Sequence, residues 1–202
     1  MDLPTPTTPL IPPTPLALPT LRTERLTLRA PSETDLPDMP GVLSDPEISP
    51  NSRNIPYPYT DEAARHGLDR YTGLTRDGAA LTLFVEETET GSLVGLVVLI
   101  VHEPGKDGGD GGVGELGYAL GRAWWGKGYA TEASNAMLAH GFDTLGFERI
   151  GAHTKLGNAG SCRVLEKLGM VSLGVQKESC ESDGVHHDAN GFMITKDQWE
   201  NR

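Results

Sequence analysis

The chain has 202 residues, enough for one domain with a sizeable hydrophobic core. Its net charge of −11 argues against a nucleic-acid-binding surface, and no apolar run approaches the roughly 18 residues of a membrane span. The two cysteines, Cys162 and Cys180, are too few for a dense disulfide framework and lack the spacing of metal ligands. We therefore expect a cytoplasmic protein that uses no metal and binds neither nucleic acid nor membranes.

The first twenty residues differ in composition from those that follow. They contain seven prolines and five threonines, and they lack the basic start and unbroken apolar stretch of a secretory signal. This composition is typical of extended, polyproline-like chain. We predict a poorly ordered tail over residues 1–20 and one folded domain over residues 21–202.

The first part of the domain is expected to contain three strands and two helices. Ser32 can cap a helix toward Leu43, which two prolines shorten or break, and Thr60 precedes a second helix with acidic residues in its first turn. The strands are predicted by apolar runs and alternation. They lie over Arg25–Ala30, Ala80–Glu87 and Leu93–Val101, and a glycine-rich connection over residues 102–112 follows the third.

The second part begins with a strand over Gly114–Leu120 and a helix over Thr131–Phe147. On this strand Glu115 lies opposite the apolar face, between small residues that leave space beside its carboxylate. The remaining predicted elements are a strand over Arg149–Leu156, a helix from Asn158 to Gly169, a strand over 170–176, a loop over 179–191 and a strand over 192–195. The order β-α-α-β-β-β-α-β-α-β-β predicts an α/β fold with one mixed sheet and helices on both faces.

A glycine-containing turn joins the strand over Gly114–Leu120 to its helix. Gly126 and Gly128 bracket Lys127, so the backbone there can adopt conformations that side chains forbid. A strand, a turn and a helix start bring several N–H groups and the positive helix end to one point, which favours an anion. The turn therefore predicts a phosphorylated ligand, with local positive charge available from Arg122, Lys127, Arg163 and Lys167.

Three pieces of the chain resemble the GCN5-related N-acetyltransferases (GNAT), and among them the RimJ/RimL-like ribosomal-protein acetyltransferases. They are the turn Trp125–Ala130, the Asn158/Ser161 pair with the Val-Leu-Glu-Lys helix behind it, and the opening LRTERLTLRAPSETDL. Trp125 replaces the usual Arg or Gln, a change common in this branch, and Met170 replaces the usual Phe, which is a volume-tolerant change. The resemblance covers roughly residues 21–199.

The resemblance implies acetyl-CoA as co-substrate and assigns residues to it. Backbone N–H groups of the turn would bind the pyrophosphate, and the pantetheine arm would lie between the strands Glu115–Leu120 and Ile150–Leu156, where they separate. Asn158 would hydrogen-bond the pantetheine, and Ser161 would lie near the thioester sulfur. The implied cofactor-binding residues are Leu120, Trp125, Gly126, Lys127, Gly128, Tyr129, Ala130, Thr131, Asn158 and Arg163.

Acetyl transfer to nitrogen also requires a neutral amine. At pH 7, deprotonating an α-amine of pKa about 8 costs roughly 1.4 kcal/mol, whereas a lysine costs roughly 4.6 kcal/mol. A site with one carboxylate therefore suits an α-amine or another weakly basic amine. Glu115 is the predicted base or amine-orienting group, Ser161 is the second predicted catalytic residue, and either Ser161 or Tyr118 could hydrogen-bond the leaving thiolate.

Each assignment has a structural alternative. In the alternative, non-catalytic roles, Glu115 forms an ion pair with a neighbouring cation, and Ser161 hydrogen-bonds its own helix. Glu132 then stabilises the N-terminus of its helix through its negative charge. His186, His187 and Asp188 resemble a metal cluster, but without a further ligand at suitable spacing they are interpreted as part of a substrate-side loop.

We interpret the chain as an acetyl-CoA-dependent N-acetyltransferase that transfers acetyl directly to an amine. The acceptor would be a peptide N-terminus or, alternatively, a small molecule such as a polyamine. A catalytically silent protein that binds acyl-CoA is the alternative from another class.

Overall fold

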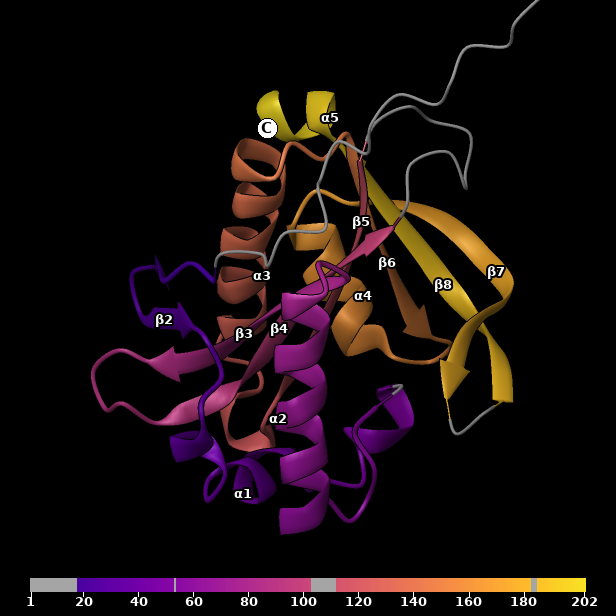
Figure 1. Cartoon of the computed structure of the whole chain (residues 1–202). Coiled ribbons are helices and arrows are strands. Elements are labelled where there is room, and N and C mark those ends of the chain that lie inside the picture. Colours follow the sequence, from indigo (N-terminus) through magenta and orange to yellow (C-terminus); the bar gives the residue numbers. More distant parts are fainter. Residues whose placement is uncertain (1–17, 53, 103–111, 183–184) are drawn as a thin grey trace, which may run out of the picture.

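The computed structural model describes residues 18–52, 54–102, 112–182 and 185–202, and in it one eight-stranded mixed sheet carries the helices (Figure 1). The strand order is β1-β2-β3-β4-β5-β6-β8-β7, and only β5 and β6 pair in parallel. The strands are β1 (Leu21–Arg22), β2 (Leu26–Arg29), β3 (Ala80–Glu87), β4 (Leu93–His102), β5 (Val113–Leu120), β6 (Arg149–Lys155), β7 (Val171–Ser182) and β8 (Val185–Thr195).

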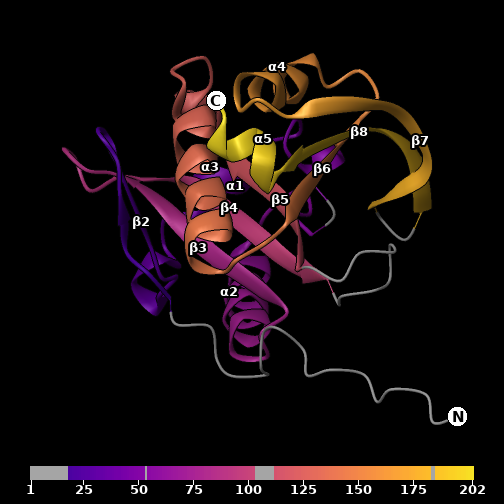
Figure 2. The same cartoon turned by 90° about the horizontal axis from the view of Figure 1, so that it is seen from above.

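Helices cover both faces of the sheet, as the sequence predicts. One hydrophobic cluster joins the sheet to α3 and α4, and a second joins it to α1 and α2. Figure 2 shows α3 and α4 on one side of the strands and α2 on the other. The helices are α1 (Met39–Leu43), α2 (Asp61–Arg76), α3 (Tyr129–Ala139), α4 (Ala159–Lys167) and α5 (Lys196–Glu200).

Local signals explain where the helices begin. The Thr60 hydroxyl accepts a hydrogen bond from the Ala63 N–H at the start of α2, and the Asn158 side chain accepts one from the Ser161 N–H at the start of α4. Two prolines divide the predicted first helix into a 3-10 turn, Glu33–Asp35, and the short α1. The two capping residues and the break were therefore predicted from sequence.

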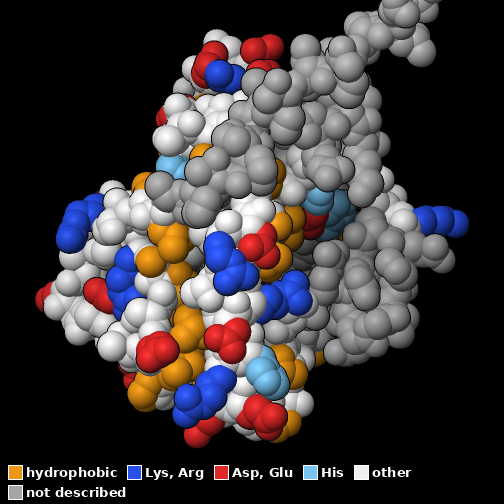
Figure 3. All heavy atoms as spheres, in the orientation of Figure 1, with side chains coloured by type: hydrophobic (Ala, Val, Ile, Leu, Met, Phe, Trp, Pro, Cys, Tyr) orange, Lys and Arg blue, Asp and Glu red, His pale blue; other side chains and the backbone are white. Residues whose placement is uncertain are grey.

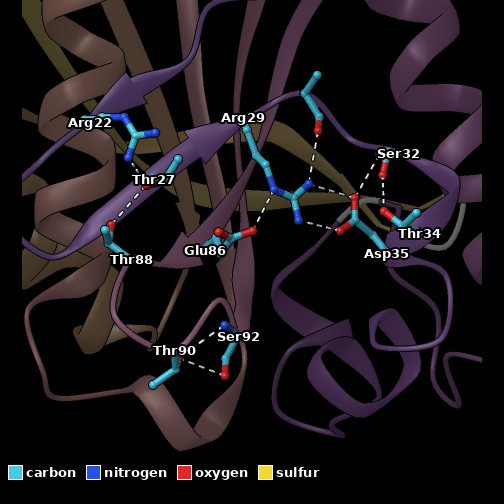
Figure 4. A network of polar contacts seen from close by, with 11 residues as sticks. Arg22, Thr27, Arg29, Ser32, Thr34, Asp35, Glu86, Thr88, Thr90 and Ser92 are labelled. Atoms are coloured by element: carbon cyan, nitrogen blue, oxygen red, sulfur yellow. Dashed lines mark hydrogen bonds and ion pairs between the residues drawn. The ribbon is translucent and has the colours of Figure 1, made fainter.

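Arg29 ties β2 to its neighbours (Figure 4). Its guanidinium forms two hydrogen bonds with the buried Asp35, at 2.7 and 3.0 Å, and a third with Glu86 on β3, at 2.7 Å. The Asp35 carboxylate also accepts the Ser32 N–H. These bonds fix the N-terminal strand to the rest of the sheet, because a partly buried charge is stable only when it is paired.

Strand β5 has the two faces that alternation predicts. Leu116 and Leu120 are buried against α3 in the first cluster, whereas Ala119 packs on the cluster that contains α1 and α2. Glu115 shares the face of Ala119. The carboxylate therefore lies on the α1/α2 side of the sheet and the apolar side chains on the α3/α4 side.

The final hairpin is longer than predicted. The expected loop over residues 179–191 is wrong: β7 continues to Ser182 and β8 begins at Val185, and the backbones pair as far as these two residues. The predicted strand over Arg149–Leu156 is one residue too long, because β6 ends at Lys155 and Leu156 is 51% exposed. The hairpin was missed because backbone hydrogen bonds extend it, and these leave no apolar pattern in the sequence.

Parts of the sequence prediction fall outside the described residues. These are residues 1–17 of the proposed tail and 103–111 of the glycine-rich connection. Among the helices of the described part, none has the length and apolar content that crossing a membrane requires.

Candidate functional site

A gap opens in the sheet between β5 and β6. The two strands pair at only three positions, the last of which joins Glu115 to Gly151. Beyond it β5 stays paired with β4, and β6 stays paired with β8. The backbone groups that face the gap from Leu116–Leu120 and Ala152–Lys155 are therefore available to an extended ligand. This is the strand separation that the resemblance implied.

The glycine turn stands at the open end of this gap, between β5 and α3. Gly126 and Gly128 have φ values of +76° and +83°, in the left-handed region that favours glycine. Gly128 is the N-cap residue of α3, so no capping side chain occupies the N–H groups at the start of this helix. In the part of the chain that the structure describes, no acceptor bonds the six N–H groups from Gly126 to Thr131. Unpaired donors at a positive helix end fit the phosphates of CoA.

Two side chains hold this turn in place. Trp125 donates from Nε1 to the Leu120 carbonyl at 2.7 Å, and Arg25 donates from Nη1 to the Lys127 carbonyl at 2.9 Å. Arg25 also forms a 2.6 Å ion pair with Glu132 and lies 4.6 Å above the Tyr129 ring. The sequence prediction missed Arg25, although it lies in the opening segment that carried part of the resemblance.

The predicted cofactor residues differ in what they can offer. The Tyr129 side chain is buried and donates to Glu87, so only its N–H group faces the turn. Lys127 is exposed, and Arg122 is occupied by an ion pair with Glu47. The backbone therefore offers most of the donors, and Lys127 adds an exposed cation within the turn.

Two surface hollows flank these residues. One, of about 620 Å³, is bordered by Gly128 and Thr131 together with Arg22, Arg25 and Lys167. The other, of about 340 Å³, lies at the start of α4. Asn158 and Arg163 border the second hollow, so the structure brings these two predicted residues together.

The start of α4 presents Asn158 and Ser161 to the gap. Asn158 Oδ1 accepts the Ser161 N–H at 3.0 Å, and this leaves the amide Nδ2 as the donor for a ligand. Among the described residues, no hydrogen bond from the Ser161 hydroxyl to its own helix is found, and this side chain interacts with the Tyr118 phenol. Tyr118 donates to the Ser161 carbonyl at 3.4 Å, and burial raises the pKa of this tyrosine to about 12.

Glu115 lies at the closed end of the gap between two histidines. His102 Nε2 is 3.2 Å from its Oε2, and His153 Nδ1 is 3.4 Å from its Oε1. Burial raises the pKa of this carboxyl, but the hydrogen bonds and charges of His102 and His153 outweigh burial and lower it to about 2. In Figure 3 histidine side chains border an acidic one beside the grey residues. Glu115 is therefore ionised at neutral pH.

The two predicted catalytic residues lie on opposite sides of β5. Glu115 shares a face with Ala119 on the α1/α2 side, whereas Ser161 approaches from the α3/α4 side, next to Tyr118. A thioester lying in the gap would meet Ser161 on one side and Glu115 on the other.

Both histidines were missed by the sequence prediction. His102 follows the apolar run that predicted β4 by one residue, and His153 alternates with the buried Ala152 and Thr154. That alternation was a usable signal for His153, since it places a polar side chain on the face of Glu115. The predicted side-chain cluster of residues 186–188 lies partly outside the described side chains, and no group of three metal-ligating residues is found among those described.

Comparison with known proteins identifies the fold and the family. Residues 25–171 match the model of the acetyltransferase (GNAT) domain. The N-acetyltransferase p20 of Bacillus licheniformis is 32% identical over 183 residues, which is 89% of this chain and 98% of p20.

Two solved structures have the same fold. A ribosomal-protein alanine acetyltransferase from Vibrio fischeri superposes with a TM-score of 0.72 at 21% identity, over 89% of this chain and 98% of that one. The microcin self-immunity acetyltransferase MccE, in complex with acetyl-CoA and AMP, gives 0.73 at 18% identity, over 86% and 93%. With a GNAT domain over most of its length and donors that fit CoA at the α3 turn, the chain belongs to the GNAT acetyltransferases and is an acetyl-CoA-dependent N-acetyltransferase.

Proposed function

We propose that this enzyme transfers acetyl from acetyl-CoA directly to the α-amine of a protein N-terminus. The observation that carries the proposal is the ionised Glu115, held between His102 and His153 at the closed end of the gap. A site with one carboxylate and two imidazoles suits an α-amine, whose deprotonation at pH 7 costs roughly 1.4 kcal/mol, better than a lysine, for which it costs roughly 4.6 kcal/mol. The fold neighbour from Vibrio fischeri, named for action on a ribosomal protein, supports the same acceptor class.

The roles of the predicted residues follow from their positions. The N–H groups from Gly126 to Thr131 bind the pyrophosphate, and the edges of β5 up to Leu120 and of β6 hold the pantetheine arm. Asn158 Nδ2 donates to that arm, and Arg163 lies beside it. The Ser161 hydroxyl and the protonated Tyr118 phenol stabilise the departing thiolate, which has a pKa of about 8.5 and needs little further assistance.

A polyamine is the second candidate acceptor. The net charge of −11 creates a field that attracts cationic molecules to the protein. A small amine would then reach the α1/α2 side of the gap, where Glu115 lies.

Thiol release from acetyl-CoA, measured against a panel of acceptors, tests the proposal. The panel contains peptides that differ in their first residue, the same peptides with a blocked N-terminus and an internal lysine, and spermidine. We expect free-N-terminus peptides to react at least tenfold faster, in kcat/KM, than blocked ones. If spermidine reacts faster than the free-N-terminus peptides, the proposed protein acceptor is wrong and the acceptor is a small amine. Thermal stabilisation by acetyl-CoA without thiol release in any arm would indicate a catalytically silent protein.

A further inference from the structure

Three titratable side chains from three neighbouring strands meet on one face of the sheet. Glu115 on β5 is paired in register with Ile100 on β4 and Gly151 on β6. His102 and His153 each lie two residues beyond these partners, so each is a diagonal neighbour of Glu115. Their side chains are 38% and 31% exposed, against 22% for Glu115, so a solvent-borne amine reaches the imidazoles first.

The charge of Glu115 determines which nitrogen of each imidazole carries the proton. An ionised carboxylate only accepts hydrogen bonds, so the nitrogen that faces it must be the donor. His153 therefore carries its proton on Nδ1 and His102 on Nε2. In the neutral form, the lone pair of His153 lies on Nε2, directed away from Glu115.

Strand register distinguishes the two histidines. β5 remains paired with β4 along its whole length, and His102 pairs with Val113 at the end where β5 and β6 are also joined. His153 follows Gly151 by two residues on β6, beyond the last pair between β5 and β6. His153 is therefore in the part of the sheet that has opened, and His102 is not.

Few charged groups face His153 from the strands around it. β8 places residues without charge opposite this stretch of β6, and Lys155 is the next side chain along the same face. The titratable groups that share this face on β4, β5 and β6, among the described residues, are Glu115, His102, Arg149 and Lys155. The partner positions on β8 are Ala189, Gly191 and Met193.

Building on the proposed α-amine transfer, we propose that His153 is the general base of the reaction and that Glu115 is its positioning residue. One proton of the α-ammonium passes to His153 Nε2, and the neutral nitrogen then forms a bond to the acetyl carbonyl carbon while the bond from that carbon to sulfur breaks. The CoA thiolate leaves with the electron pair and takes the second proton of that nitrogen, and His153 afterwards releases its own proton to solvent. Glu115 holds the Nδ1–H of His153 and stabilises the imidazolium that forms.

Glu115 is the weaker base of the two groups. A carboxyl is the weaker base already at its ordinary pKa of about 4.5, at which it accepts a proton from an α-ammonium of pKa about 8 with an equilibrium constant near one in three thousand. For a free imidazole, with a pKa of about 6.5, the same equilibrium constant is about one in thirty. The proposal differs from the sequence prediction, in which Glu115 itself was the base or the amine-orienting group.

The first test needs no acceptor. Histidine side chains of the full chain, labelled with nitrogen-15, are observed by NMR at pH 7.5, and His153→Gln assigns the His153 signal. We expect the Nδ1–H tautomer at His153, and a larger shift on addition of CoA at His153 than at His66, an exposed residue of α2. An Nε2–H tautomer, or an unshifted His153 when CoA is bound, would overturn the proposal.

The second test uses a peptide with an N-terminal alanine, and spermidine if it is the better acceptor. His153→Gln should lower kcat roughly 100-fold or more and remove the acid limb of the kcat–pH profile, while the Kd of CoA stays within twofold. We expect a smaller loss for His102→Gln, with the acid limb retained, and no change for His66→Gln. A kcat for His153→Gln within threefold of wild type would contradict the proposal. If the wild-type enzyme acetylates no amine, the acceptor proposal fails, and the tautomer and CoA shift still decide the role of His153.

Discussion

The charge state of Glu115 is the residue-scale feature on which the site depends. Burial alone would favour a neutral carboxyl, yet His102 and His153 contribute hydrogen bonds from both sides and keep it ionised. The effect links catalysis to folding, because any group whose pKa changes on folding makes stability depend on pH. Replacing Glu115 therefore has a pH-dependent effect on the free energy of unfolding.

We predict that Glu115→Gln destabilises the protein more at pH 6.5 than at pH 3. The pKa of this carboxyl falls from 4.5 to about 2 on folding, so its contribution is complete above pH 4.5 and is lost as the pH falls toward 2. The ceiling is about 3 kcal/mol, and solvent screening reduces it. Urea unfolding at both pH values measures the difference, with Glu89→Gln in an exposed turn as control. A difference that stays constant or grows at pH 3 would contradict the pairing with the two histidines.

At the scale of elements, the N-terminal strand supports the CoA-binding turn. Arg25 precedes β2, bonds the Lys127 carbonyl of the turn and pairs with Glu132 in the first turn of α3. Glu132 also accepts from the Thr23 hydroxyl at 2.6 Å. The sequence prediction placed Glu132 at the helix N-terminus, but its bonds to Thr23 and Arg25 come from residues more than a hundred positions away and no local pattern shows them.

We predict that Arg25→Met weakens CoA binding roughly three- to tenfold, because a net hydrogen bond contributes about 1 kcal/mol to holding the turn. Isothermal titration calorimetry measures the Kd. Glu132→Gln should weaken binding less, and the double variant should lose less than the sum, since both residues belong to one network. Arg76→Met, which removes a guanidinium paired only with the adjacent Asp77 in the described structure, is the control. Equal effects of Arg25→Met and Arg76→Met would show that net charge, rather than the turn, is responsible.

Element boundaries show how far sequence patterns reach. The predicted strand Ala80–Glu87 has the observed bounds of β3, because a buried strand needs a continuous apolar run. Strand β4 ends at His102, one residue later than predicted. Backbone pairing of His102 with Val113, rather than hydropathy, determines this end of the strand. Backbone pairing holds the β7–β8 hairpin together past residue 178. The sequence there is polar and has no apolar pattern, which is why a loop was predicted.

At the scale of the whole molecule, the order of elements from β2 to β8 and the mixed sheet were predictable, whereas β1, α5 and the contacts across the gap were not. Glu115 and His153 are brought together by the parallel register of β5 and β6, which three residue pairs define. Sequence alternation assigns a side chain to a face but does not give the register between strands so far apart in the chain. The turn was predictable because its glycines, strand and helix are contiguous.

The central claim is that acetyl-CoA lies across the α3 turn and the gap between β5 and β6. Hydrogen–deuterium exchange with and without CoA tests it most directly, because the N–H groups from Gly126 to Thr131 have no acceptor among the described residues. We predict that CoA slows exchange in peptides covering residues 116–131 and 152–163 and leaves α2 unchanged. Unaltered exchange at residues 126–131 while calorimetry shows CoA bound, or protection confined to β7 and β8, would contradict the account.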